Sequence, residues 1–272
     1  MSDTVLIIGA NGKTGRRVKT RLEARGVPVR AASRGTAIPF DWQRPDTWAP
    51  ALEGTTRAYV TYQPDLAIAG ADEAIDRLAG LAREAGLRQM VLLSGRGEPG
   101  AQRAETALQE SGLGWNVVRA SWFNQNFSEG YLLGSVLSGE LALPAGPVAE
   151  PFIDADDIAD VAVATLTDAR HANRLYEVTG PRALTFAEAV DEISRAAGRT
   201  VRFRQVSAKA FADAMAGHAP PEIIDLLLDL FTVVLDGRNR ATASGVEQAL
   251  GRRPRDFADY AREIAATGLW RG

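Results

Sequence analysis

Residues 5–17 constrain the fold of this chain more than any other segment, because an apolar run leads into glycines spaced G-x-x-G-x-x-G and then into a basic stretch. The run at 5–8 is typical of a parallel strand buried on both faces. Gly9, Gly12 and Gly15 let the backbone turn sharply and approach a pyrophosphate without a Cβ in the way. A helix N-terminus favours negative charge, so the lysine and two arginines that follow favour a docked anion. A turn that merely joined strand to helix would leave these features unexplained, and we predict dinucleotide contacts at Gly9, Asn11, Gly12, Lys13, Thr14 and Gly15.

Apolar runs alternate with helical patterns through the first half of the chain. Strands are expected at 5–8, 27–32, 58–61, 90–93 and 115–119, and helices near 15–25, 45–52, 70–85 and 101–110. This alternation predicts an α/β fold, a doubly wound parallel sheet with right-handed crossovers.

The second half returns to the sheet once and then becomes mostly helical. A short strand at 152–153 is expected to lead into an acid-capped helix to about 166, followed by a strand at 174–178. Thr185 and Glu188 form a capping box before a helix to about 197. A strand is expected at 201–205, and helices at 208–215, 221–235 and 257–266. We expect residues 1–150 to bind the dinucleotide, with sheet elements returning at about 151–180, and residues 181–272 to form a smaller, mostly helical substrate-binding cap.

Composition limits the class of protein. The 272 residues are 46% hydrophobic and carry a formal net charge of −3, and cysteine is absent, which excludes disulfides and thiol nucleophiles. Scattered arginines argue against nucleic-acid binding, and no run approaches the roughly 18 apolar residues of a membrane span. A strand begins within a few residues of the start, with no basic leader, so we expect a cytoplasmic protein. The acidic run at 154–160 suggests a metal, yet helix N-capping accounts for it, and we predict no metal site.

The end of the second expected strand indicates which dinucleotide binds. In a dinucleotide fold, a carboxylate about 20 residues past the glycines would bridge the ribose hydroxyls. This chain has Ser33 and Arg34 there instead, which can engage a 2′-phosphate, so NADP(H) is favoured over NAD(H). A solvated cation at the strand end is the alternative for Arg34. Asp41 is a candidate adenine contact, although an ordinary loop carboxylate fits equally well.

Several motifs together resemble the NmrA-like family of atypical short-chain dehydrogenases/reductases. They are Gly9-Ala-Asn-Gly-Lys-Thr-Gly15, Arg119-Ala-Ser-Trp-Phe-Asn-Gln-Asn-Phe127, Pro151-Phe-Ile-Asp-Ala-Asp-Asp-Ile158, Tyr176-Glu-Val-Thr-Gly180 and Leu250-Gly-Arg-Arg-Pro-Arg-Asp-Phe257. The chain looks most similar to the branch of agroclavine-type dehydrogenases and NAD(P)H-dependent quinone, azo-dye and triphenylmethane reductases. This resemblance implies a Rossmann domain with a small C-terminal substrate domain and NAD(P)(H) binding. Some members reduce substrates and others act as redox-sensing regulators.

The usual acid of short-chain dehydrogenases, a tyrosine with a lysine four residues later, is missing. The residues four beyond the five tyrosines are Gln, Leu, Ser, Gly and Ile, and the three lysines stand elsewhere. Hydride transfer without a strong acid suits an acceptor that is already electron-poor or cationic. Candidate pocket residues follow the later strands. They are Tyr62, Ser94 and Asn126 as catalytic residues, and Gln63, Trp122, Phe123 and Asn124 as substrate contacts.

We therefore expect an NADPH-dependent reductase of a planar small molecule of the iminium, quinone or quinone methide type, in secondary metabolism. Two alternatives stay open: an NAD(P)-sensing regulator without catalysis, and a non-redox cyclase or rearrangement enzyme. Packing against the cap is an alternative role for Trp122 and Phe123, and satisfying buried backbone groups is one for Asn126. The apolar helix at 223–235 fits either a pocket cover or the interface of a homodimer.

Overall fold

The computed structural model describes residues 3–271 and divides into two compact units. The first unit consists of the residues up to Ala120, with Ala155–Val178 and Ser244–Arg252. The second consists of Ser121–Asp154, Thr179–Ala243 and the residues from Arg253 onward. The chain therefore passes between the two units several times, whereas the sequence predicted boundaries only at about residues 150 and 181.

The first unit contains the predicted parallel sheet, which the structure confirms. Its six strands have the order β2-β1-β3-β4-β5-β8, and every neighbouring pair is parallel. The strands are β1 (Val5–Ile8), β2 (Val29–Ala32), β3 (Arg57–Val60), β4 (Gln89–Gly95), β5 (Gly114–Ala120) and β8 (Arg174–Val178). All four residues of β1 are buried, as expected for a strand covered on both faces. Strand order reverses between β1 and β3, and ligands of such sheets bind beyond the carboxyl ends of the strands at this point.

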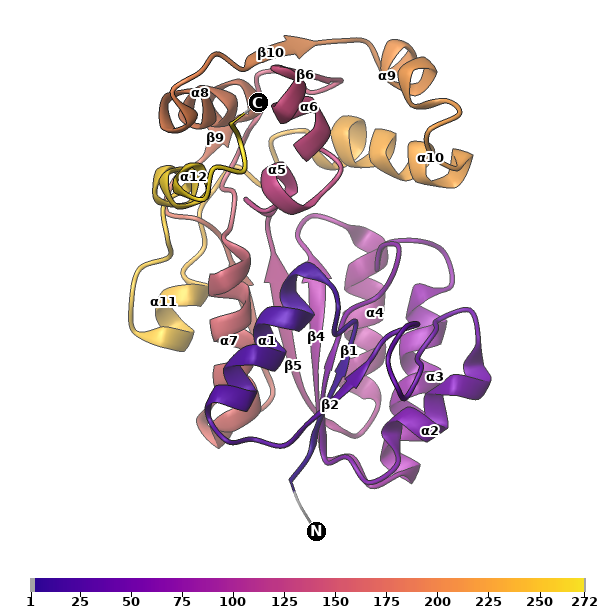
Figure 1. Cartoon of the computed structure of the whole chain (residues 1–272). Coiled ribbons are helices and arrows are strands. Elements are labelled where there is room, and N and C mark those ends of the chain that lie inside the picture. The colour runs from indigo at the N-terminus through magenta and orange to yellow at the C-terminus, as the bar shows by residue number, and fades with distance from the viewer. Residues whose placement is uncertain (1–2, 272) are drawn as a thin grey trace. The chain divides into compact units, whose positions relative to one another are not determined.

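Helices cover both faces of this sheet (Figure 1). On one face α1 (Lys13–Ala24) packs against α7 (Ala155–Thr167), which also contacts α11 (Gly245–Leu250). On the other face α3 (Ala71–Glu84) packs between α2 (Trp48–Leu52) and α4 (Pro99–Glu110). Short 3₁₀ turns lie at Pro45–Thr47 and Ala169–His171. Because the strands are parallel, the turns that follow β1, β2, β3 and β4 all lie along one edge of the sheet.

The second unit is mostly helical, with two small two-stranded sheets. Parallel β6 (Glu140–Leu143) and β10 (Arg202–Gln205) form one, and antiparallel β7 (Ala149–Glu150) and β9 (Leu184–Thr185) form the other. Its helices are α5 (Asn126–Glu129), α6 (Leu133–Ser138), α8 (Phe186–Ala197), α9 (Ala208–Met215), α10 (Pro221–Asp229) and α12 (Phe257–Ala266). Phe127, Phe152, Phe186 and Phe257 pack edge to face or tilted at the centre of its apolar core.

Most predicted elements are present, and three details are corrected. The capping box of Thr185 and Glu188 forms as expected. The single helix expected at 221–235 instead ends as α10 at Asp229 and continues as a π-helical turn, Leu230–Val234, which an i, i+4 pattern does not reveal. Residues 152–153 form only an isolated bridge, from Ile153 to Phe123, and the strand is β7 just before them. The short elements α5, α6, α11 and β6 were not anticipated from the sequence.

Within residues 3–271, no helix is both long and apolar enough to cross a membrane. The described part of the chain also contains no cluster of three or more histidine, cysteine or acidic side chains that could hold a metal ion.

Candidate functional site

The turn between β1 and α1 requires glycine at positions 9 and 15. Gly9 has a φ of +81°, and a Cβ on it would lie 2.0 Å from the Thr61 hydroxyl oxygen. A Cβ on Gly15 would lie 2.2 Å from the carbonyl oxygen of Gly9. The helix therefore begins in direct contact with the turn, and its backbone can approach a ligand closely.

The N-terminus of α1 offers backbone donors to an anion. Its N-cap is Gly12, which has no side chain with which to cap the helix, and its first turn contains no acidic residue. Thr14 is buried in this turn, while Asn11 and Gly12 are exposed. The structure therefore brings the predicted pyrophosphate contacts together in one turn.

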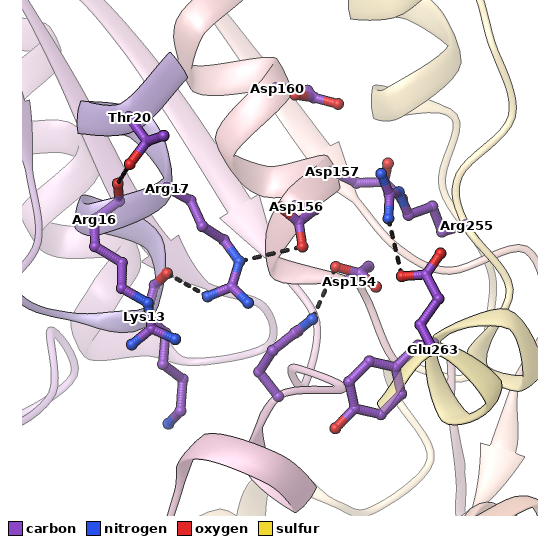
Figure 2. A network of polar contacts seen from close by, with 12 residues as sticks. Lys13, Arg16, Arg17, Thr20, Asp154, Asp156, Asp157, Asp160, Arg255 and Glu263 are labelled. Atoms are coloured by element: carbon purple, nitrogen blue, oxygen red, sulfur yellow. Dashed lines mark hydrogen bonds and ion pairs between the residues drawn. The ribbon is translucent and has the colours of Figure 1, made fainter. Parts of the chain in front are cut away.

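Carboxylates of α7 neutralise part of the basic charge at the start of α1. This corrects the expectation that only a docked anion would neutralise it. The Arg17 guanidinium turns toward Asp156 of α7, with Nε 3.2 Å from the carboxylate, and also donates to the Lys13 carbonyl (Figure 2). One turn further along, Arg21 pairs with Asp156 and Asp160. The acidic run thus stabilises the packing of α7 against α1, in addition to its place at the start of α7.

The loops after β2 and β3 meet the glycine turn and each other. The Asn11 backbone N–H donates to the Ser33 hydroxyl at 3.4 Å, and the exposed Arg34 guanidinium donates to the Gln63 side-chain carbonyl at 3.4 Å. These contacts place Ser33, Arg34 and Gln63 on one edge of the sheet. The Asp41 carboxylate accepts the Gln43 backbone N–H, as an ordinary turn residue does.

Tyr62 extends from the end of β3 into an aromatic group. Its ring lies 4.5 Å from that of Trp42, whose indole donates to the Thr61 carbonyl. Burial raises the pKa of the Tyr62 hydroxyl. Tyr59, three residues earlier and within β3, is fully buried, and burial raises the pKa of its hydroxyl as well.

Ser94, at the end of β4, belongs to a buried charged network that the sequence analysis did not find. Its hydroxyl donates to Glu105 of α4 at 2.6 Å, and the Arg119 guanidinium of β5 donates to both oxygens of the same carboxylate. Arg119 and Arg96 also pair with Glu177 of β8. Glu105 is 2% exposed, so this ion pair fixes the direction in which the Ser94 hydroxyl points.

The predicted residues after β5 lie in the second unit, where they pack among its own side chains. The Trp122 ring lies 5.3 Å from Phe186 and 5.1 Å from Phe231, in agreement with the packing alternative. Phe123 forms a bridge with Ile153, and Asn126 opens α5. Asn124 is fully buried, and neither side-chain amide atom has a hydrogen-bond partner among the described residues.

Two family models match this chain. The model described as NAD(P)H-binding covers residues 9–169, and the model of the NmrA-like family covers residues 103–261. The chain belongs to the NmrA-like family. The resemblance seen in the sequence motifs is therefore confirmed, and the NAD(P)H-binding model begins at the first glycine of the turn described above.

Curated relatives and solved structures match over nearly the whole chain. An NAD(P)H azoreductase of Xenophilus azovorans is 31% identical, over 96% of this chain and 98% of the relative. A (4-alkanoyl-5-oxo-2,5-dihydrofuran-3-yl)methyl phosphate reductase of Streptomyces griseus is 30% identical over the same shares. The crystal structure of an NADPH-dependent quinone oxidoreductase from Escherichia coli, in complex with NADPH, matches with a TM-score of 0.79 at 19% identity, over 96% of this chain and 99% of that one. That structural likeness supports the Rossmann-type fold.

Proposed function

We propose that this protein is an NADPH-dependent reductase of a planar, electron-poor small molecule, such as an iminium ion, a quinone or a quinone methide. The observation that carries the proposal is the edge formed by the ends of β1 to β4. This edge combines a glycine turn whose backbone can approach a pyrophosphate with Arg34 at the position that would distinguish NADP from NAD. The chain lacks a tyrosine with a lysine four residues later.

The residues of this edge fit NADP(H). The backbone of Gly12–Gly15 and the open N-terminus of α1 would hold the pyrophosphate. Arg34 and Ser33 would hold the 2′-phosphate, since a planar guanidinium recognises a phosphate through paired hydrogen bonds. Asp41 is kept as a proposed adenine contact. The bound nicotinamide would supply the hydride.

An electron-poor acceptor suits the side chains at this edge. Hydride transfer to an iminium ion needs no acid, because the charge that it neutralises is already on the acceptor. Proximity and alignment can then lower the barrier by several kcal/mol. The names of the two curated relatives describe reductases of an azo compound and of an acylated unsaturated lactone, and both are electron-poor π systems.

The roles proposed for individual residues are given for each unit by itself. Tyr62 and Gln63 would face the nicotinamide and the acceptor, and Ser94 would accept a hydrogen bond, since it donates its own proton to Glu105. Within the second unit, Trp122, Phe123 and Asn124 stay proposed substrate contacts, and Asn126 stays a proposed catalytic residue. A homodimer and a cytoplasmic location complete the proposal, the latter because a chain without cysteine suits a reducing compartment.

The test is a direct assay of turnover. Purified protein is mixed with NADPH or NADH and a panel of quinones, iminium ions and azo dyes, and the loss of nicotinamide absorbance is followed. We expect turnover with NADPH and at least one acceptor. If NADP⁺ and NADPH bind with different affinities but no acceptor is reduced, the protein is a sensor of the redox state and not a reductase.

A further inference from the structure

A reductase of quinones must deliver a proton as well as a hydride, and neither predicted hydroxyl is suited to supply it. The Ser94 proton is engaged by Glu105, which is itself ion-paired with Arg119. Burial raises the pKa of Tyr62, and Leu66 stands where a lysine would be needed to lower it. We therefore looked for another group at this edge that could deliver the proton.

Two carboxyl groups meet between the loops that follow β3 and β4. Asp65 follows Tyr62 and Gln63 by a few residues, and Glu98 follows Ser94 at the start of α4. The Glu98 side chain hydrogen-bonds the Asp65 side chain. Asp65 also accepts the Ala67 backbone N–H at 2.8 Å, so the loop after β3 fixes its position.

The backbone holds this carboxyl pair in place. Glu98 is the N-cap residue of α4, yet its side chain makes no capping bond and lies over Gly95 instead. A Cβ on Gly95 would be 2.2 Å from the Glu98 Oε1, and a Cβ on Gly100 would be 2.1 Å from the Ala67 carbonyl oxygen. The two loops therefore touch at Gly100, and the missing side chain of Gly95 leaves room for the Glu98 carboxyl group.

Two carboxyl groups can share a hydrogen bond only if one of them keeps a proton. Burial, and next the negative charge of Asp65, raise the pKa of Glu98 to about 9. Three charged groups of the neighbouring elements form ion pairs with other residues. Asp72 of α3 pairs with Arg103 of α4, and Arg96 of the β4 loop pairs with Glu177. Burial and the charge of Asp65 therefore favour the protonated form of Glu98 at the carboxyl edge of the sheet.

We propose that Glu98, held by Asp65, is the proton donor of the reductase reaction. This inference rests on the proposed function. When a quinone is reduced, the hydride brings two electrons to the quinone, which becomes a hydroquinone monoanion, while the nicotinamide is oxidised. The O–H bond of Glu98 then breaks, an O–H bond forms on the anion, and the Glu98 carboxylate regains a proton from water. Reduction of an iminium ion to an amine needs only the hydride.

The experiment compares these two acceptors in one protein. Glu98→Gln keeps a neutral hydrogen-bonding group beside Asp65 but has no acidic proton. We expect the ratio of the quinone rate to the iminium rate to fall by about a hundredfold or more, the lower end of what general acid catalysis typically contributes. In Asp65→Asn the like charge is removed, so the loss of quinone reduction at high pH should begin at a lower pH than in the wild type.

A second readout needs no cofactor. The infrared band of a protonated carboxyl group should be present in the free wild-type protein at neutral pH, disappear as pH rises through about 9, and be missing in Glu98→Gln. An unchanged rate ratio in Glu98→Gln, or no such band in the wild type, would overturn the proposal. If the wild type reduces neither acceptor, the proposed function fails and this inference fails with it, whatever the band shows.

Discussion

Replacing Gly15 with alanine tests the physical basis of the cofactor turn. The new Cβ would lie 2.2 Å from the oxygen and 2.8 Å from the carbonyl carbon of Gly9, and both are backbone atoms. Forced overlap of this kind costs about 3 kcal/mol, whereas an unhindered Gly→Ala change inside a helix gains about 1 kcal/mol. The net loss for Gly15→Ala is therefore about 2 kcal/mol. Gly80→Ala is the matched control, because that glycine lies within α3 with nothing within 4 Å of the added atom.

The assay is urea denaturation of the three proteins, with NADPH binding measured by calorimetry. We expect Gly80→Ala to be about 1 kcal/mol more stable than the wild type, so that the two variants differ by about 3 kcal/mol. Only Gly15→Ala should lose NADPH binding, since the start of α1 must move away from Gly9 to accommodate the methyl group. If both variants were equally stable and both bound NADPH as the wild type does, the proposed role of this turn would be refuted.

Three further predictions concern charged groups of the first unit. Arg34→Ala should weaken NADPH binding by about tenfold to a hundredfold and leave NADH binding unchanged, because it removes a charge-assisted hydrogen bond to the 2′-phosphate. Binding is measured by titration with each cofactor. Arg44→Ala, which removes an exposed ion-pair partner of Asp46, is the control. The free energy of unfolding should fall as pH rises from about 5 to 9, by at most about 1.4 kcal/mol per pH unit. The reason is that Glu98 in the folded protein keeps a proton that the unfolded chain has released. Denaturation of Glu98→Gln across the same pH range should lack this slope. Glu105→Ala should destabilise the protein by about 3 kcal/mol or more, because it leaves the largely buried Arg119 guanidinium and the Ser94 hydroxyl without their main acceptor. A melting midpoint equal to that of the wild type would show that this charged network does not stabilise the fold.

Much of the fold could be predicted because its signals are local. The apolar run before the glycines, the alternation of strands and helices, and the capping box of Thr185 and Glu188 each depend on residues close together in the sequence. Elements that depend on packing between distant segments were harder to predict. The π-helical turn Leu230–Val234 and the short helix Gly245–Leu250 form where distant segments pack, and propensity alone does not specify them.

The same distinction applies to the candidate site. The proposed cofactor residues lie mainly in one turn and at the next strand end, so their spacing along the chain was enough to predict them. The pairing of Arg17 with Asp156 joins residues that are 139 positions apart, and it changes how the basic helix start must be interpreted.

The sequence by itself determined the parallel sheet, the glycine turn, the arginine at the second strand end and the missing tyrosine–lysine pair, since each of these is a matter of residue identity and short spacing. Only the tertiary structure brings Glu98 and Asp65 together. They stand far apart in the chain, and they meet because neighbouring parallel strands bring their loops to the same edge of the sheet, where burial and the charge of Asp65 raise the pKa of Glu98.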